Sequence, residues 1–341
     1  MKNYRLALLG FGNVGQAFLR LLQRKKDLLQ QEYGLRFTLT GIATARHGTV
    51  IDHNGIDGDR ALLLLSHGNR LDQFSTGPSI GDPLEFVRNC GADVLFENTP
   101  VSYTDGQPAL IYLRTALGLG MHAITANKGP VVYGYQELTA LAMQHGCNFF
   151  FESAVMDGAP IFSLFREGLP ATSLHSFHGI LNSTTNLILT RMESGDTFEG
   201  SVAYAQSIGL TETDPSGDID GWDAAVKVAA LVTVLMGIPL KPGDVERTGI
   251  RGLTPEDISL AHTQVKRWKL VCSAKREGNS VTTRVAPELV DADSLLYGVN
   301  GTSSIVTFET DVLPQLSIVE GNPGPETTAY GLLADFINAA R

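Results

Sequence analysis

The chain opens with a short apolar strand, a glycine-rich turn and an amphipathic helix. The strand covers residues 4–9, the turn reads Gly10-Phe-Gly12-Asn-Val-Gly15, and the helix carries Phe18 and Leu22 on its apolar side. In such a unit the first glycine permits a tight turn, the second admits a pyrophosphate to the backbone, and the third lets helix pack on strand. The free N–H groups of the helix N-terminus favour phosphate. We therefore predict a Rossmann-type domain with dinucleotide contacts at Gly10, Gly12, Asn13, Val14 and Gly15.

Strands and helices continue to alternate up to about residue 150. We expect strands over 93–97 and 122–125 and a helix over 135–144, and this alternation is typical of a parallel sheet. The segment Asn98-Thr99-Pro100 follows one of these strands, and such sheets bind ligands at the carboxyl ends of their strands. We predict a dinucleotide-binding domain over residues 1–150, completed by a C-terminal helix at about 320–341. The nicotinamide should lie beside Asn98, Thr99 and Pro100.

The end of the second strand bears on the choice of cofactor. In folds that prefer NAD, an acidic residue there holds the ribose 2′-hydroxyl. This chain instead reads Thr44-Ala45-Arg46-His47 after a strand at about 37–43. No carboxylate repels a 2′-phosphate and Arg46 can bind one, so we expect NADP to be preferred, with NAD possible. The alternative is that Arg46 is an unrelated surface residue.

The most apolar helix of the chain, Trp222 to Met236, contains a pair of opposite charges. A helix that is apolar all round is buried, and buried charges are expensive unless they are paired. Asp223 and Lys227 lie one helical turn apart and can form an ion pair. This pair has either a purely structural role or a role in a polar site.

An acidic loop directly upstream favours the site. It carries Glu212, Asp214, Asp218 and Asp220, which together predict a cation-seeking region. Asp214 and Asp220 have a simpler alternative as turn and helix-cap residues. With the strands and helices around it, this loop indicates an α+β catalytic domain over residues 151–319, so the chain as a whole is of the α/β class.

Bulk properties exclude several classes of protein. The 341 residues have a net charge of −10, which argues against binding to nucleic acid or to an anionic membrane surface. The longest apolar run is too short to span a bilayer. The three cysteines form no metal or redox motif, and no signal peptide precedes the first strand. We therefore expect a cytoplasmic protein that acts on a small molecule.

Several blocks of sequence resemble homoserine dehydrogenases. They are Ile124-Thr-Ala-Asn-Lys128, the segment 151–160 that begins Phe-Glu-Ser-Ala-Val, the segment 179–186 that reads Gly-Ile-Leu-Asn-Ser-Thr-Thr-Asn, and the acidic block with its buried helix at 209–227. Their order and spacing follow the family over essentially the whole chain. The resemblance implies reversible, NAD(P)H-dependent reduction of L-aspartate 4-semialdehyde to L-homoserine, in threonine and methionine biosynthesis.

The resemblance also implies roles for single residues. Lys128 and Lys227 should flank the reacting oxygen, and Asp223 should orient Lys227. Glu212 should hold the α-amino group of the substrate, supported by Asp218, and Thr184 belongs to the same substrate site. A solvated lysine at a strand end is the simpler alternative for Lys128. Hydride addition to an aldehyde builds negative charge on oxygen, which a lysine ammonium can stabilise and protonate.

Further implications concern a cation and the assembly. The family binds a monovalent cation, sodium or potassium, at positions that match Glu152 and the backbone carbonyls of Val155, Asp157 and Ala159. A structural carboxylate without an ion is the alternative for Glu152. The family is typically dimeric through its second domain, so a homodimer is expected. We expect no C-terminal regulatory domain.

Two other functions remain open from the residues. One is a dehydrogenase of another small amino or hydroxy acid. The other is a dinucleotide-binding sensor that has lost catalysis, although a sensor would not need a buried pair such as Asp223 and Lys227. Aspartate-semialdehyde dehydrogenase is disfavoured, because it needs an activated cysteine and the cysteines here, Cys90, Cys147 and Cys272, lie in no such site.

Overall fold

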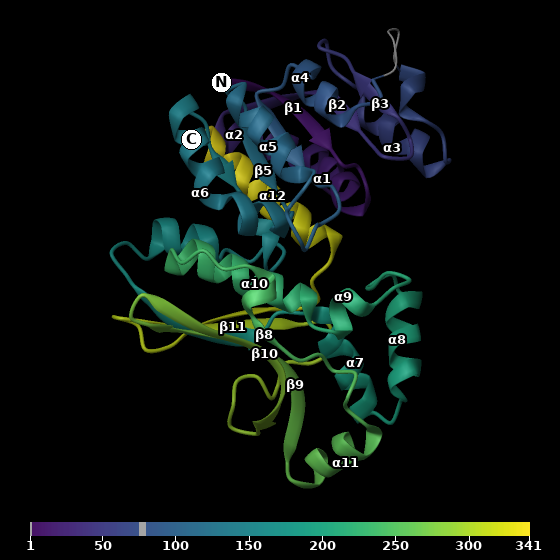
Figure 1. The fold of residues 1–341 in the computed structure, drawn as a ribbon. Helices are drawn as coiled ribbons and strands as arrows, with labels where there is room; N and C mark the ends of the chain where they lie inside the picture. The colour runs from purple at the N-terminus through teal and green to yellow at the C-terminus, as the bar shows by residue number, and fades with distance from the viewer. Residues whose placement is uncertain (1, 75–79) are drawn as a thin grey trace. The chain divides into compact units, whose positions relative to one another are not determined.

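The computed structural model describes residues 2–74 and 80–341, which divide into two compact units (Figure 1). The first unit contains Met1–Pro160 together with Gly324–Arg341, and the second contains Ile161–Pro323. The chain thus leaves the first unit and returns to it for its last helix. Among the described residues, no helix is both long enough and apolar enough to cross a membrane.

A six-stranded sheet with the order β3-β2-β1-β4-β5-β6 organises the described part of the first unit. Its strands are β1 (Lys2–Leu9), β2 (Leu35–Ala43), β3 (Thr49–Ile51), β4 (Val94–Glu97), β5 (His122–Thr125) and β6 (Phe149–Phe150). Neighbouring strands are parallel except for β3, which runs antiparallel to β2. The parallel sheet is thus confirmed, and β3 adds an antiparallel strand at its edge, because residues 44–48 are too few for a crossover and make a hairpin.

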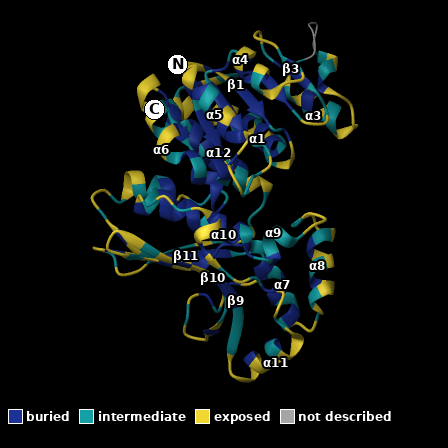
Figure 2. Cartoon of the chain, viewed as in Figure 1, coloured by how far each residue is buried: buried dark blue, intermediate teal, exposed yellow. Residues whose placement is uncertain are grey.

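Helices cover both faces of this sheet. They are α1 (Asn13–Arg24), α2 (Lys26–Tyr33), α3 (Gly58–Ser66), α4 (Pro83–Asn89), α5 (Ala109–Gly118), α6 (Lys128–His145) and α12 (Pro325–Ala340). Strand β1 shows the alternation that this requires. Leu6 and Leu8 pack in one apolar core with α1 and α12, whereas Ala7 and Leu9 pack in another with α4 and α5. Figure 2 shows these strands as buried, beneath helices whose outer faces are exposed.

The last helix of the chain belongs to the core of the first unit. Helix α12, drawn in yellow, lies beside α1 in Figure 1. Phe336 is fully buried, and its ring packs edge-on against Tyr4, with a centroid distance of 5.6 Å. The Tyr4 hydroxyl donates to the backbone oxygen of Ala340 at 3.2 Å. The two ends of the chain therefore help to close the same core.

Helix α6 begins earlier than its sequence pattern suggests. The expected start was Tyr135, but the helix runs from Lys128. Asn127 caps it, since its side-chain oxygen accepts a hydrogen bond from the Gly129 N–H at 3.0 Å. Gly129 and Pro130 resemble a loop in sequence, yet proline is well tolerated in the first turn of a helix. Lys128 consequently stands at the helix N-terminus, directly after β5.

The described part of the second unit has its own six-stranded sheet, in the order β12-β11-β7-β9-β10-β8. The strands are β7 (Leu174–Ile180), β8 (Glu246–Arg247), β9 (Lys266–Glu277), β10 (Ser280–Asp291), β11 (Ser304–Thr310) and β12 (Leu316–Glu320). All neighbours are antiparallel except β8 and β10. The helices are α7 (Ser183–Glu193), α8 (Phe198–Ser207), α9 (Ser216–Ile219), α10 (Trp222–Leu231) and α11 (Pro255–Thr263).

Helix α10 carries the charged pair. It begins after Gly221, whose φ of +80° is the left-handed conformation that favours glycine, and it continues as a π-helical turn over Val232–Met236. Its apolar residues from Ala224 to Leu231 are buried, as the sequence pattern requires. Helix α10 therefore presents Asp223 and Lys227 from a fixed support.

Candidate active site

The three glycines of the first turn do different work. Gly10 has a φ of +91°, and a Cβ placed there would lie 2.4 Å from the Asn98 backbone oxygen. A Cβ on Gly15 would lie 2.6 Å from the Gly10 oxygen, so both positions need glycine for close packing. A Cβ on Gly12 would meet no atom within 4 Å. Gly12 therefore borders open space, which a pyrophosphate needs in order to reach the backbone.

Two further observations fit a dinucleotide at this turn. Helix α1 begins at Asn13, and its N-cap residue Gly12 has no side chain to cap it. The first backbone N–H groups of the helix, including those of Asn13 and Val14, can therefore bind a ligand. The Asn98 side chain has a buried amide nitrogen and a buried oxygen, neither of which has a hydrogen-bond partner among the described residues. A buried amide without partners is costly unless a ligand supplies them. The residues present thus fit the cofactor.

Arg46 lies where the sequence places it, in the exposed loop after β2. A second arginine, which sequence reasoning did not identify, lies beside it. Arg70 donates through Nη1 to the Arg46 backbone oxygen at 3.4 Å, and its Nε pairs with Asp72 at 2.8 Å. The loop after β2 is therefore contacted by a second cation, Arg70, which is itself paired with the carboxylate of Asp72.

Lys128 belongs to the first unit, at the carboxyl end of β5. The residue before it, Asn127, donates through Nδ2 to the backbone oxygens of Thr99 at 3.2 Å and Pro100 at 3.4 Å. The start of α6 and the 98–100 loop are thus joined. The predicted nicotinamide loop and the predicted lysine form one local assembly.

In the second unit, Lys227 is held by two acceptors. Its Nζ lies 3.1 Å from Asp223 Oδ2 and donates to the Leu181 backbone oxygen at 2.6 Å. The side chains of Lys227 and Asp223 are 14% and 12% exposed, so the pair is largely removed from water. Such a pair holds its geometry better than a surface ion pair.

Asn182 is the residue that connects the site, and sequence reasoning had noticed it only as part of a polar segment. Its Nδ2 donates to Asp218 Oδ1 at 2.7 Å and to Asp223 Oδ2 at 3.0 Å. Its Oδ1 accepts from the Thr185 N–H at 2.8 Å and so caps α7. One amide therefore bridges two carboxylates and fixes them relative to the start of a helix.

The electrostatic surroundings of Asp218 favour its protonated form. Burial, and then the charge of Asp223, raise the pKa of the Asp218 carboxyl above its ordinary value. Thr211 Oγ1 and Asn182 Nδ2 donate to it and offset part of that effect. A ligand cation at Asp218 would relieve the same repulsion.

The other predicted substrate residues are less closely joined. Thr184 is buried in the first turn of α7, beside Asn182. Glu212 is exposed, and its backbone oxygen accepts from Gln206 Nε2 at 3.3 Å. Asp214 accepts from the Ser216 N–H at 3.0 Å in a local turn, and Asp220 pairs with Arg251 at 2.6 Å. Asp214 thus makes the turn contact expected of the simpler alternative. Asp220 does not cap α10, which has Gly221 at its N-cap, and its partner Arg251 lies 31 residues away.

The predicted cation segment lies within the first unit. Glu152 is 3% exposed, and its N–H donates to Asp335 Oδ2 at 2.7 Å. Asp157 has a φ of +41°, and Thr327 Oγ1 donates to its carboxylate at 3.1 Å. Among the described residues there is no group of three or more histidine, cysteine, aspartate or glutamate side chains that could hold a metal. The predicted ligands Val155 and Ala159 would contribute backbone oxygens.

A buried lysine that sequence reasoning missed contacts Asn186, which lies one helical turn beyond Asn182. Lys269 on β9 is fully buried, and its Nζ donates to Asn186 Oδ1 at 3.0 Å and to the Val299 oxygen at 2.6 Å. Burial lowers the pKa of Lys269 to about 8. The charged residues Lys266, Arg267 and Lys269 interrupt the apolar pattern at the start of β9, and sequence reasoning therefore missed this strand.

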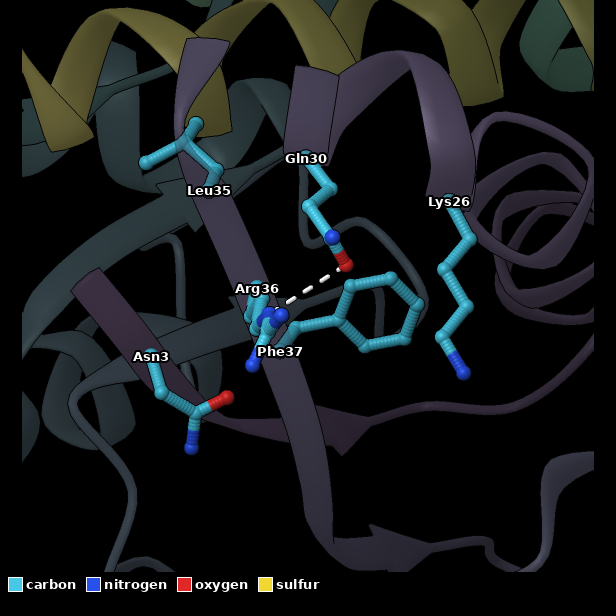
Figure 3. A pocket seen from close by; sticks show the side chains of 6 residues that line it. All are labelled: Asn3, Lys26, Gln30, Leu35, Arg36 and Phe37. Carbon is cyan, nitrogen blue, oxygen red and sulfur yellow. Dashed lines mark hydrogen bonds between the residues drawn. The ribbon is translucent and has the colours of Figure 1, made fainter. Parts of the chain in front are cut away.

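One surface hollow lies apart from these residues. It has a volume of about 280 Å³ and is lined by Asn3, Lys26, Gln30, Leu35, Arg36 and Phe37. Figure 3 shows the Gln30 amide turned toward the Arg36 guanidinium, which donates to it at 3.2 Å. The hollow contains none of the predicted site residues.

Known proteins resemble both parts of the chain. Residues 10–152 match a family model described as the NAD-binding domain of homoserine dehydrogenase, and residues 160–337 match one described as homoserine dehydrogenase. An NAD(+)-dependent homoserine dehydrogenase of Pseudomonas canavaninivorans is 33% identical over 99% of this chain and 96% of its own length. A homoserine dehydrogenase of Methanocaldococcus jannaschii is 34% identical over 98% of this chain and 97% of its own.

Solved structures agree. A putative homoserine dehydrogenase from Archaeoglobus fulgidus superposes with a TM-score of 0.86 and 30% identity, covering 98% of each chain. A hyperthermophilic archaeal homoserine dehydrogenase in complex with NADPH superposes with a TM-score of 0.84 and 28% identity, over 99% of this chain and 98% of that one.

Proposed function

The chain belongs to the homoserine dehydrogenase family and interconverts L-homoserine and L-aspartate 4-semialdehyde with NAD(P), and on this basis we propose how its own residues carry out the reaction. The observation that carries the proposal is the cluster of Lys227, Asp223 and Asp218 around the amide of Asn182. The bound nicotinamide supplies hydride in one direction and accepts it in the other.

Lys227 is proposed to act on the reacting oxygen. In the direction of reduction, negative charge grows on the aldehyde oxygen as the C–H bond forms, and a lysine N–H stabilises that charge and passes a proton to the oxygen. In oxidation the hydroxyl proton returns to the lysine. Asp223 and the Leu181 oxygen hold the amine in place, at 3.1 and 2.6 Å. For Lys128, action on the same oxygen is proposed from the family resemblance.

The substrate's α-ammonium is proposed to bind the acidic block. Asp218 is oriented by Asn182 and Thr211, at 2.7 Å each, so its carboxylate is fixed before the substrate arrives. A cation there offsets the repulsion between Asp218 and Asp223. Glu212 is proposed as the second carboxylate for the ammonium, with Thr184 contributing to the same substrate site.

The cofactor is proposed to bind the first unit at Gly10 to Gly15, Asn98 to Pro100 and Lys128. NADP preference is proposed on the strength of Arg46, with Arg70 beside it and Asp72 opposing. A monovalent cation is proposed at Glu152, Val155, Asp157 and Ala159. A cytoplasmic location is proposed as well, in keeping with the three buried free thiols. A homodimer is proposed from the family resemblance.

The first experiment is homoserine oxidation, followed by nicotinamide absorbance with NADP and with NAD. We expect Lys227→Ala to lower kcat by about 10²- to 10⁴-fold, the range of general acid–base contributions. Lys266→Ala is the control, because Lys266 also forms an ion pair, with Asp291 at 3.0 Å, and no hydrogen bond among the described residues joins its side chain to a predicted site residue. A Lys227→Ala enzyme that keeps most of its kcat would overturn the assignment.

Arg46→Ala in the same assay tests the cofactor proposal. Loss of a phosphate contact should weaken NADP binding by about tenfold or more, the usual size of a charge-assisted hydrogen bond, and leave NAD binding nearly unchanged. An unchanged ratio of the two cofactors would identify Arg46 as an unrelated surface residue.

A further inference from the structure

We propose that Glu97 is a positioning residue for the cofactor side of the reaction, because it ties the 98–100 loop to the start of α6. The inference rests on the function proposed above, which assigns the cofactor to these segments. Glu97 is a fully buried carboxylate at the last position of β4. Burying an ionisable group in such a place costs free energy unless hydrogen bonds compensate for it, so the contacts of Glu97 indicate what it does.

The hydrogen bonds of Glu97 reach two separate segments. Its Oε1 accepts from the Thr99 N–H at 2.7 Å and from the Thr99 hydroxyl. Its Oε2 accepts from the hydroxyl of Thr125, the last residue of β5, at 2.7 Å. Burial raises the pKa of the Glu97 carboxyl, while these donors lower it. One side chain therefore spans the carboxyl ends of two adjacent strands.

The connection continues from Thr125 to Lys128. Thr125 Oγ1 accepts from the Asn127 N–H at 2.9 Å, and Asn127 Oδ1 caps α6 through the Gly129 N–H at 3.0 Å. Helix α6 starts at Lys128. Hydrogen bonds through Thr125 and Asn127 therefore connect the first turn of α6 to the Glu97 carboxylate, which helps to hold that turn in place.

The other end of the network meets the glycine turn. The Asn98 N–H donates to the Leu9 backbone oxygen at 2.7 Å, and the Asn98 backbone packs so closely on Gly10 that a Cβ would lie 2.4 Å away. Because Glu97 fixes Thr99, it also limits how Asn98 can shift against that turn. The glycine turn, the 98–100 loop and the start of α6 thus share one buried anchor.

If Glu97 only stabilised the fold, removing its contacts would lower the free energy of unfolding and leave cofactor affinity unchanged. Cofactor affinity is therefore the deciding measurement. Thr125→Val removes the hydroxyl of a fully buried strand residue with little change of shape. Thr40→Val is its matched control: Thr40 is also fully buried in a strand, and in the described part of the chain its hydroxyl donates to the neutral backbone oxygen of Leu6, at 3.3 Å. Thr125→Val should lose more stability than Thr40→Val, because its hydroxyl contacts a carboxylate and the Asn127 N–H, so Tm is recorded for both variants and the comparison of Kd decides.

The experiment measures the Kd for NADP by calorimetry, with Tm and homoserine oxidation alongside. We expect Thr125→Val to raise Kd by about fivefold and Glu97→Leu by about tenfold or more; these factors are smaller than the full loss of the hydrogen bonds, because only part of that loss reaches the cofactor through the loop and the helix. Thr40→Val should stay within about twofold of the wild type. Glu97→Gln should restore most of the affinity, because its amide can still accept from Thr99 and donate to Thr125.

The outcomes separate the inference from the function on which it rests. Equal Kd values for Thr125→Val and Thr40→Val would overturn the positioning role, even if Glu97→Leu fails to fold. Wild-type protein that neither binds NADP or NAD nor oxidises homoserine would instead overturn the proposed function.

Discussion

The Asn182 bridge gives the sharpest prediction, through the substitution Asn182→Asp. Aspartate caps a helix as well as asparagine does, so the contact with the Thr185 N–H is kept. The change removes the donor that serves Asp218 at 2.7 Å and Asp223 at 3.0 Å, and it places a third carboxylate against them. Only the bridge is altered.

The cost follows from the chemistry of those contacts. Hydrogen bonds to charged groups contribute about 1.5–3 kcal/mol each, so losing both costs about 3–6 kcal/mol. Repulsion among three carboxylates adds to this until one of them takes up a proton. Protonating an ordinary aspartate at pH 7 costs about 4 kcal/mol, and this cost changes by about 1.4 kcal/mol per pH unit. The added repulsion cannot exceed the cost of protonation, because a carboxylate would take up a proton first. We expect a loss of at least about 4 kcal/mol at pH 7.

The pH dependence has a definite sign. In the variant the folded carboxylate cluster binds a proton that the unfolded chain has released at neutral pH, so at least one folded pKa lies above its unfolded value. Stability relative to the wild type is therefore regained as the pH falls toward the ordinary pKa of aspartate and lost as it rises. Urea unfolding at several pH values between 5 and 8 measures this difference.

Asn186→Asp on the same helix is the matched control. Asn186 Nδ2 donates to the neutral backbone oxygens of Val299 at 3.3 Å and Ser303 at 3.1 Å, and its Oδ1 accepts from Lys269. The new charge there meets a cation, so the loss should be below about 2 kcal/mol. Equal losses in the two variants, or a pH-independent deficit in Asn182→Asp, would refute the account of the bridge.

Two further predictions test other features. Gly12→Ala should keep the wild-type Tm but weaken NADP binding by about tenfold or more. Gly15→Ala should lower the Tm itself, because its Cβ would lie 2.6 Å from the Gly10 oxygen. Calorimetry measures both quantities, and the reverse result would contradict the roles assigned to the two glycines. Because burial lowers the pKa of Lys269 to about 8, the wild type should gain about 3 kcal/mol relative to Lys269→Met as the pH rises from 8 toward 10.5, and a flat difference in urea unfolding would disprove this.

The elements that follow from local pattern were predicted well. The strand, glycine turn and helix at residues 4–22 and the buried helix from Trp222 depend on period and on turn chemistry, which a single sequence displays. Comparison with known proteins confirms the family and the fold class. The predicted start of α6, Tyr135, was wrong by two turns, since the helix begins at Lys128. The glycines and the proline after Lys128 suggested a loop, although Asn127 caps a helix there.

What the sequence could not show are the contacts between distant side chains. Asn182 lies 36 residues from Asp218 and 41 from Asp223, so no local pattern relates them. Glu97 looked like an ordinary strand end, and its partner Thr125 is on another strand. Lys269 interrupted an apolar pattern and so concealed β9, since a buried lysine is rare unless it has partners. Tertiary packing alone decides these positions.

The return of the chain to its first unit has a consequence for synthesis on the ribosome. The first unit needs residues 324–341, and α12 packs against α1 with Phe336 fully buried. Residues 161–323 must therefore be translated before the nucleotide-binding core can close, so that core cannot finish folding ahead of the unit that follows it in the chain. A ribosome stalled before residue 324 would hold an open, apolar surface on α1 and β1, which a chaperone would have to cover.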